Sequence, residues 1–378
     1  MKKLIRVSTI PTSLNTFCRG QLNMLSSYFE VVALSSPGEE LDEIASREHV
    51  RTIAVPMQRH ISLLKDFVSL CRLIYVFHKE RPYIVHSMTP KAGLLSMVAA
   101  WITRVPVRIH TFTGLVFPTA HGLMQRILML MDGITCFCAT NISPEGQGVK
   151  RDLEHFSITR KPLHIVANGN VRGIDLQYYD RTPKVMVAAD NFKRTNCFTF
   201  CFVGRIVADK GINELVEAFC KLYEENPAVR LLLVGRYEED LNPLEKNTIN
   251  IIHTCTAIEH VGQQADVRPY MAASDALVFP SYREGFPNVV LEAGAMGLPA
   301  IVTDINGSNE IIENEKNGLI IPPKDTQALF LAMKEFATNS TLVQNMARNT
   351  RQIIADRYEQ KMIWGELLAW YQSLCKDR

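Results

Sequence analysis

Two carboxylates and two cations, well separated along the chain, have the chemistry to bind a phosphorylated sugar. Glu284 and Glu292 have seven residues between them, and Arg205 and Lys210 follow an apolar run that is typical of a buried strand. Guanidinium and ammonium groups form charge-assisted contacts with a diphosphate, each contributing about 1.5–3 kcal/mol. Carboxylate oxygens accept hydrogen bonds from sugar hydroxyls. The four side chains therefore predict a nucleotide-sugar site.

The elements around these residues are expected to place them at one edge of a parallel sheet. Residues 276–279 predict a short buried strand, Pro287 suits the first turn of a helix, and Gly297 marks the end of that helix. Glu284 then lies on a strand-to-helix loop and Glu292 on the helix. Open α/β sheets bind ligands at the carboxyl ends of their strands, and a helix start suits phosphate.

Together, the two motifs resemble those of the retaining glycosyltransferases of the GT-B fold, family 4. The resemblance rests on Gly204-Arg205 with Lys210-Gly211, and on EGFPN at residues 284–288 with Glu292. It covers nearly the whole chain. HSMTPKAG at residues 86–93, with RIHT at residues 108–111, resembles the bacterial branch that builds capsule, O-antigen and exopolysaccharide repeats.

The resemblance implies a role for each of these residues. Glu284 would lie beside the donor sugar and its developing positive charge, and Glu292 would bind the ribose hydroxyls. Arg205 and Lys210 would hold the diphosphate and stabilise the leaving group. The other donor-binding positions are Gly204, Gly285, Phe286, Pro287, Asn288 and, beside the nucleobase, Val261. The alternative is that both carboxylates are solvated surface groups and that the Gly-Arg and Lys-Gly pairs are a solvated turn.

The first half of the chain departs from the family pattern. Many relatives have a Thr-x-His-Gly turn after the fifth strand, and here Thr113 occupies the position of that His. In those relatives, the His contacts the donor sugar. His110 lies three residues earlier, and it either takes over this polar contact or is a core histidine. The glycine pair after the first strand is also absent, and Ser13 and Asn15 stand in that loop. Recognition of the sugar or the acceptor by the first domain is therefore expected to differ from that of many relatives.

Short apolar runs alternate with helical patterns along the whole chain, which predicts the α/β class with doubly wound parallel sheets. The resemblance implies two Rossmann-like domains and a C-terminal helix that crosses back to the first domain. We expect an acceptor-side domain at residues 1–180, a linker at 181–197, a nucleotide-sugar domain at 198–357 and the final helix at 358–378. Trp364 and Trp370 would anchor that helix. The expected strands include residues 134–138, 164–167 and 249–253.

Length and composition are ordinary for a globular chain with two domains. It has 378 residues, of which 47% are hydrophobic and 21% charged. The nine cysteines form no pair of CxxC clusters, so reduced thiols in a cytoplasmic protein are expected rather than zinc or disulfides. The absence of GxGxxG after the first strand argues against dinucleotide binding. The longest apolar run, residues 92–103, is too short to span a bilayer.

Charge is unevenly distributed. Residues 1–180 contain 20 Lys and Arg against 14 Asp and Glu, whereas the remainder contains 21 against 25. A basic first half favours an anionic membrane or a lipid diphosphate. Residues 59–81 and 122–131 combine apolar and basic side chains, and either lie on the cytoplasmic face of the inner membrane or pack as ordinary helices. Uneven surface charge without a partner is the other interpretation.

The predicted function is transfer of a hexose or amino sugar from a nucleoside diphosphate, with UDP the expected carrier. The acceptor would be a glycan on a polyprenyl diphosphate. By resemblance, the reaction retains configuration, needs no metal or other cofactor, and lets the leaving phosphate deprotonate the acceptor. One alternative is a nucleotide-sugar 2-epimerase of GT-B-like fold, which would act on the donor alone. A second is a non-catalytic sugar-nucleotide-binding protein, which would not need all four charged residues.

Overall fold

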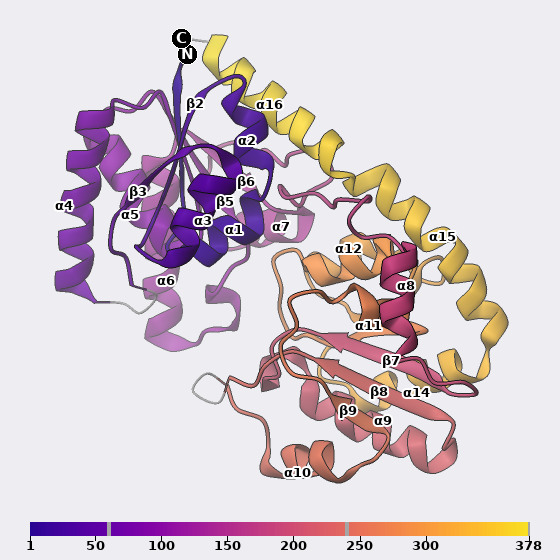
Figure 1. Ribbon diagram of the computed structural model, residues 1–378. Helices are drawn as coiled ribbons and strands as arrows, with labels where there is room; N and C mark the ends of the chain where they lie inside the picture. Colours follow the sequence, from indigo (N-terminus) through magenta and orange to yellow (C-terminus); the bar gives the residue numbers. More distant parts are fainter. Residues whose placement is uncertain (59–61, 239–241, 377–378) are drawn as a thin grey trace. The chain divides into compact units, whose positions relative to one another are not determined.

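The chain divides into two compact units, each with its own sheet (Figure 1). The computed structural model describes residues 1–58, 62–238 and 242–376. Unit 1 comprises Met1–Gly173 and the residues from Lys361 onward, and unit 2 comprises Ile174–Gln360. Both sheets have six strands, all paired in parallel, so the prediction of two doubly wound parallel sheets is confirmed.

Unit 1 has the strand order β3-β2-β1-β4-β5-β6, in which the direction of winding reverses between β1 and β4. The chain begins at the centre, builds one half outward and returns to build the other. The centre is apolar because both faces are covered, and Leu4 and Ile5 of β1 are fully buried. The strands are β1 (Lys3–Val7), β2 (Glu30–Ser35), β3 (Arg51–Ala54), β4 (Ile84–Met88), β5 (Val107–Phe112) and β6 (Asn141–Pro144).

Three helices of unit 1 lie side by side, with α5 (Pro90–Ile102) packed between α4 (Leu63–Glu80) and α6 (Gly122–Cys138). Because α5 has a neighbour on either side and the sheet beneath, eight of its thirteen residues are buried, and its sequence is apolar nearly all round. The other helices of this unit are α1 (Pro11–Cys18), α2 (Gln21–Ser26), α3 (Glu39–Glu48), η1 (Phe117–Thr119), α7 (Gln147–His155) and α16 (Gln360–Lys376).

The last helix, α16, completes the core of unit 1. The hydroxyl of Tyr371 accepts a hydrogen bond from the buried guanidinium of Arg6 (2.6 Å) and lies 2.5 Å from Nδ1 of His86. Trp370 stacks on His164 with ring centroids 4.4 Å apart, and Trp364 donates its indole N–H to the carbonyl of Arg172 (2.9 Å). Both predicted tryptophan anchors therefore contact unit 1.

Unit 2 has the strand order β12-β11-β10-β7-β8-β9, which reverses between β7 and β10. Its strands are β7 (Phe198–Val203), β8 (Val229–Val234), β9 (Ile258–His260), β10 (Ala276–Phe279), β11 (Ala300–Thr303) and β12 (Gly318–Ile321). Its helices are α8 (Pro183–Asp190), η2 (Ala208–Lys210), α9 (Ile212–Glu225), α10 (Lys246–Thr254), α11 (Arg268–Ala272), α12 (Asn288–Ala295), α13 (Ser308–Ile311), α14 (Thr326–Thr338) and α15 (Ser340–Tyr358). The reversal predicts the ligand crevice at the carboxyl ends of β7 and β10.

Three predicted strands are wrong. Residues 134–138 continue α6, because apolar residues recur every three or four positions from Leu123 to Phe137 and this helical period outweighs local strand propensity. Residues 249–253 belong to α10, which buries Thr248 and Ile252 one turn apart. Residues 164–167 form no strand and are preceded by a single bridge between Ile142 and Leu163. Helix α8 lies within the segment expected to be a linker, and Thr182 caps its start.

Candidate functional site

The loops that follow β7 and β10 are bonded to each other in unit 2. The two strands pair in parallel, so their carboxyl ends open onto the same edge of the sheet. The backbone N–H of Tyr282 donates to the carbonyl of Asp209 (2.9 Å), and the Tyr282 hydroxyl donates to the carboxylate of Glu214 (2.5 Å). These bonds fix the Glu284 loop against the loop that carries Arg205 and Lys210.

Glycine is required where these loops approach closely. Gly211 has φ +70°, and a Cβ there would lie 2.1 Å from the carbonyl oxygen of Pro280. Gly235, after β8, has φ +155°, and a Cβ there would lie 1.7 Å from the carbonyl oxygen of Gly204. Both positions combine backbone crowding with a conformation that other residues rarely adopt. The backbone itself therefore lines this edge of the sheet.

Lys210 and Glu284, predicted from separate motifs, form an ion pair. Their side chains are 14% and 17% exposed, so the pair is shielded but reachable. Ser281 Oγ donates to the same Glu284 oxygen (2.8 Å), and Lys210 Nζ lies 5.1 Å from the centre of the Phe279 ring. A cation held directly beside a carboxylate suits a ligand whose anionic diphosphate adjoins a hydroxylated sugar.

Arg205 lies at the same edge but pairs elsewhere. Its guanidinium bonds the carboxylate of Glu238 (2.8 Å), which follows β8 and also bonds Arg236 (3.0 Å). The hydrogen bond from Arg205 holds the pKa of Glu238 below its usual range. The structure therefore brings Lys210, but not Arg205, to Glu284. Sequence reasoning missed Glu238, and its place just past the end of β8 is the signal that could have identified it.

The remaining predicted donor-site residues surround the start of α12. Glu292 is half-buried on that helix, one turn after Asn288, which begins it. Phe286 is buried with its ring edge-on to Tyr358, centroids 5.5 Å apart. Gly285, Phe286 and Pro287 are also confined, because a Cβ added at Gly307 would lie 2.6 Å from the carbonyl oxygen of Gly285, 2.7 Å from Cα of Phe286 and 2.7 Å from the ring Cδ of Pro287.

Val261 marks the far end of the same edge. It directly follows β9, and its N–H donates to the carbonyl of Leu233 (3.0 Å). Because β8 separates β9 from β7, Val261 lies across one strand from the loop of Gly204. Its contact with a nucleobase stays a prediction.

The two predicted residues of unit 1 differ in environment. His110 is 1% exposed, its Nδ1 lies 2.9 Å from Ser87 Oγ, and burial lowers its pKa to about 3. A Cβ at Gly93 would lie 2.3 Å from its ring, so α5 packs directly on the imidazole. Thr113 is half-buried just past β5. His110 is therefore a neutral core group within unit 1, and donor contact by either residue stays a prediction.

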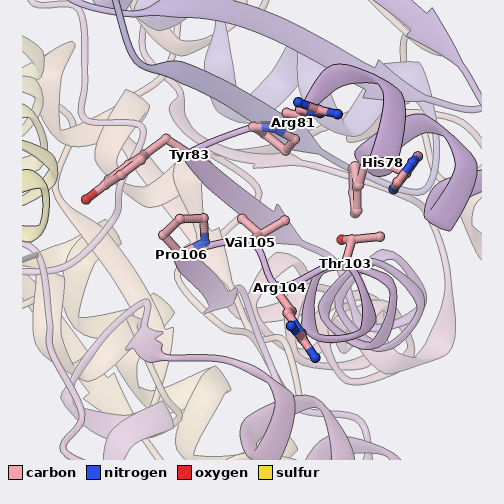
Figure 2. Close-up of a pocket in the computed structure, with 9 residues that line it drawn as sticks. His78, Arg81, Tyr83, Thr103, Arg104, Val105 and Pro106 are labelled. Atoms are coloured by element: carbon pink, nitrogen blue, oxygen red, sulfur yellow. The ribbon is translucent and has the colours of Figure 1, made fainter.

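A cavity of about 360 Å³ opens in unit 1 at the amino ends of strands β4 and β5 (Figure 2). Its lining includes His78 and Arg81 at the end of α4, Tyr83 just before β4, and Arg104 before β5. Figure 2 shows that the charged ends of Arg81 and Arg104 and the ring of His78 extend in different directions. Because it lies at the amino ends of the strands and its cations diverge, this cavity is a poor candidate for a diphosphate site.

No group of three or more His, Cys, Asp and Glu side chains in the described parts of the chain is arranged to hold a metal ion. All nine cysteines lie in those parts and are free thiols. Metal independence of turnover stays a prediction.

Both halves of the chain match glycosyltransferase families. Residues 23–169 match the glycosyl transferase 4-like domain, and residues 188–353 match the glycosyl transferases group 1. The capsular polysaccharide biosynthesis glycosyltransferase CapM of Staphylococcus aureus is 30% identical over 100% of this chain and 98% of its own length. The UDP-Gal:alpha-D-GlcNAc-diphosphoundecaprenol alpha-1,3-galactosyltransferase of Escherichia coli is 29% identical over 82% of this chain and 81% of its own.

The fold agrees with these matches. Anabaena Alr3699/HepE, solved in complex with UDP and glucose, superposes with a TM-score of 0.82 at 17% identity, over 99% of this chain and all of its own. None of the relatives named here is described as an epimerase, so that alternative gains no support, and the chain is a glycosyltransferase. It belongs to the GT-B glycosyltransferases of family 4, in the bacterial branch that builds capsule and lipopolysaccharide.

Proposed function

We propose that the chain transfers a hexose or N-acetylhexosamine, with retention of configuration, from a UDP-linked donor to a glycan carried on a polyprenyl diphosphate. The observation that carries the proposal is the Lys210–Glu284 pair at the carboxyl ends of β7 and β10. The name of the Escherichia coli relative, which specifies UDP-Gal and a diphosphoundecaprenol acceptor, supports the choice of both substrates.

In the proposed reaction, the bond between the anomeric carbon and the diphosphate oxygen breaks first. The acceptor hydroxyl oxygen then bonds the anomeric carbon on the same face, and its proton passes to the departing phosphate. Lys210 and Arg205 stabilise the negative charge that develops on the diphosphate, and Glu284 stabilises the positive charge on the sugar. Glu292 holds the ribose hydroxyls, and no side chain is needed as a general base.

One experiment tests donor, acceptor and stereochemistry together. The purified chain is incubated with UDP-Gal, UDP-Glc, UDP-GlcNAc or UDP-GalNAc and with GlcNAc-diphosphoundecaprenol, in parallel samples with and without EDTA. We expect one donor to give a lipid-linked disaccharide whose new linkage is α by NMR, at a rate that EDTA does not change. A β linkage, or a new nucleotide sugar formed without acceptor, would contradict the proposal.

We further propose that unit 1 rests on an anionic membrane surface through α4, α5 and α6. Among the described residues, most exposed large apolar side chains lie on these helices: Leu63, Leu64, Phe67, Val68, Tyr75, Trp101, Ile102, Leu123, Met124, Ile127, Leu130, Ile134 and Phe137. Exposed cations on or beside them include Lys65, Arg72, Arg104 and Arg126. Apolar side chains flanked by cations are typical of interfacial helices.

Arg59 and His60, with which the predicted membrane segment begins, lie outside the described residues. The described helices include none that is both long and apolar enough to cross a bilayer. The membrane proposal therefore concerns a surface, and it rests on the exposed side chains of α4, α5 and α6.

Vesicle sedimentation tests the membrane proposal. Leu64 and Phe67 are 85% and 65% exposed, and changing both to Ser is expected to weaken binding to phosphatidylglycerol-containing vesicles by about tenfold or more. Leu331→Ser is the matched control, because Leu331 is 53% exposed on α14 of unit 2. Equal binding by the double variant and the control would contradict the proposal, and so would binding that ignores lipid charge.

A further inference from the structure

The stretch at residues 86–93, which the donor site does not use, borders a cavity of about 350 Å³ in unit 1. The cavity lies past the carboxyl ends of β1 and β4. Its polar lining includes Thr9, Ser13, Thr89 and Lys91, and its apolar lining includes Leu128 and Met131 of α6. Because one wall is cationic and hydroxylated and another is apolar, the cavity suits an amphiphilic anion.

Lys91 is placed where an isolated cation is unfavourable. It is the second residue of α5, next to the positive end of the helix dipole, and it is only 8% exposed. Its ammonium bonds both carboxylate oxygens of Asp66 on α4, at 2.8 and 3.0 Å. An anion in the cavity would be favoured both by Lys91 and by the α5 dipole. The alternative role of the pair is only to tie α4 to α5.

Two threonines add a donor to the same wall. Thr9 Oγ1 and Thr89 Oγ1 lie 2.8 Å apart, so one hydroxyl hydrogen joins them and the other is left to donate elsewhere. Thr89 has φ +74°, which is unusual for a β-branched residue, and the N–H of Thr9 holds it by donating to its hydroxyl (3.2 Å). Strained backbone that the surrounding structure holds in place is concentrated at binding and catalytic sites.

Ser87 and Gly93, in the same stretch, fix the position of the cavity wall that carries Lys91. Gly93 admits the ring of His110, and Ser87 bonds that ring, so the first turn of α5 is fixed against β4 and β5. On the other side, α6 presents Leu128 and Met131 to the cavity while Ile127 and Leu130 are exposed. Apolar surface therefore continues along α6 from the outer face into the cavity.

We propose that this cavity binds the diphosphate of the lipid-linked acceptor, with Lys91 as the principal cation. The diphosphate replaces the carboxylate of Asp66 on the Lys91 ammonium, and no covalent bond changes. Leu128 and Met131 contact the first isoprenoid unit. Asp66 neutralises the Lys91 ammonium while the cavity is empty and competes with the acceptor diphosphate for it. This inference rests on the proposed function, because it assigns a site to the acceptor named there.

Farnesyl diphosphate is the probe, and saturating UDP is present throughout to occupy the donor site. Calorimetry compares the wild-type protein with Lys91→Met and Asp66→Asn. We expect Lys91→Met to weaken binding by about tenfold to a hundredfold and Asp66→Asn to bind as tightly as wild type or more tightly. A purely structural ion pair predicts similar losses in both variants. That symmetric result would overturn the proposal, as would unchanged binding by Lys91→Met or no binding by wild type.

Two further probes identify the source of the diphosphate. Pyrophosphate and farnesol should each bind more weakly than farnesyl diphosphate, and Met131→Gln should weaken binding of farnesyl diphosphate but not of pyrophosphate. Pyrophosphate that binds as tightly as farnesyl diphosphate would overturn the assignment to a lipid. If Lys91→Met unfolds, Lys91→Arg keeps the charge and should bind within a few-fold of wild type, and its failure to bind would count against the proposal.

Kinetics separate this inference from the proposed function. With GlcNAc-diphosphoundecaprenol as acceptor, Lys91→Met should raise the KM for acceptor, while Asp66→Asn should not. The Kd for UDP, which reports on unit 2, should be the same in both. If the wild-type protein transfers no sugar to this acceptor, the proposed function is refuted. If the wild-type protein transfers sugar and Lys91→Met has an unchanged KM for acceptor, only the acceptor site is refuted.

Discussion

The charged residues of the two units occupy different environments. In unit 2, Arg205, Lys210 and Glu284 lie on loops past the strand ends, paired with carboxylates or cations and still within reach of solvent. In unit 1, the histidines of the motifs at residues 86–93 and 108–111 are interior groups: His86 and His110 are fully or almost fully buried and bond to hydroxyls. These unit 2 side chains present charge past the strand ends, whereas these two unit 1 histidines fix the core.

The two environments predict whether a substitution changes kinetics or stability. A loop carboxylate that is partly solvated contributes little to folding but much to a ligand whose charge develops beside it. A buried imidazole or a helix glycine in close contact contributes to folding first, because its neighbours cannot relax without loss of packing. Variants of unit 2 should therefore change kinetics, and variants of the unit 1 core should change stability.

Glu284→Gln should have the largest effect. We expect kcat to fall by about a hundredfold or more, because the amide cannot stabilise positive charge on the sugar. The melting temperature should change little, and UDP should bind at least as tightly, because the carboxylate no longer competes with the diphosphate for Lys210. UDP release, calorimetry and thermal melting measure the three quantities. Glu217→Gln, on the exposed face of α9, is the control. Full activity in Glu284→Gln would remove the carboxylate from the mechanism.

Gly93→Ala should act in the opposite way. The added Cβ would lie 2.3 Å from the His110 ring, so we expect the free energy of unfolding to fall by about 1–3 kcal/mol through overpacking. Gly365→Ala in α16 is the matched control, because among the described residues no atom beyond its chain neighbours and the backbone of its own helix lies within 4 Å of the added Cβ. Alanine should stabilise that helix by up to about 1 kcal/mol. Equal stability of the two variants in denaturant melts would contradict the packing argument.

Local sequence predicted strands and helices better than it predicted the partners of charged side chains, for a physical reason. Residues 276–279 form the predicted strand with its predicted bounds, because the apolar run and the turn residues that flank it agree there. The proximity of Lys210 to Glu284 followed from the rule that the ends of parallel strands converge. By contrast, the partner of Arg205 comes from a third loop, and Lys91 and Asp66 pair across two helices although they are 25 positions apart in the sequence. Such contacts depend on tertiary packing, which no local pattern specifies.

The pH dependence of stability tests the core role of His110. Its pKa is about 3 when folded, against about 6.5 for a solvated imidazole, so below pH 6.5 the unfolded chain binds a proton that the folded chain does not. Stability is therefore full above pH 6.5 and is lost as pH falls, by about 1.4 kcal/mol per pH unit from this group. His86, whose pKa burial also lowers, adds to the slope. His110→Gln should show a shallower slope in denaturant melts between pH 6.5 and 5, and identical slopes would contradict the assignment.

Glu238→Gln should have the smallest effect and bears most directly on Arg205. In the present pairing, Glu238 competes with a diphosphate for the guanidinium, and Arg205 is 44% exposed, so the ion pair contributes no more than about 1 kcal/mol. Removing the negative charge should tighten UDP binding by about two- to fivefold at low salt, and less at high salt. Arg205→Ala should weaken the same binding. If Glu238→Gln and Arg205→Ala both leave the Kd for UDP unchanged in calorimetry, Arg205 lies outside the diphosphate site, and Lys210 is the cation of the predicted pair that remains assigned to it.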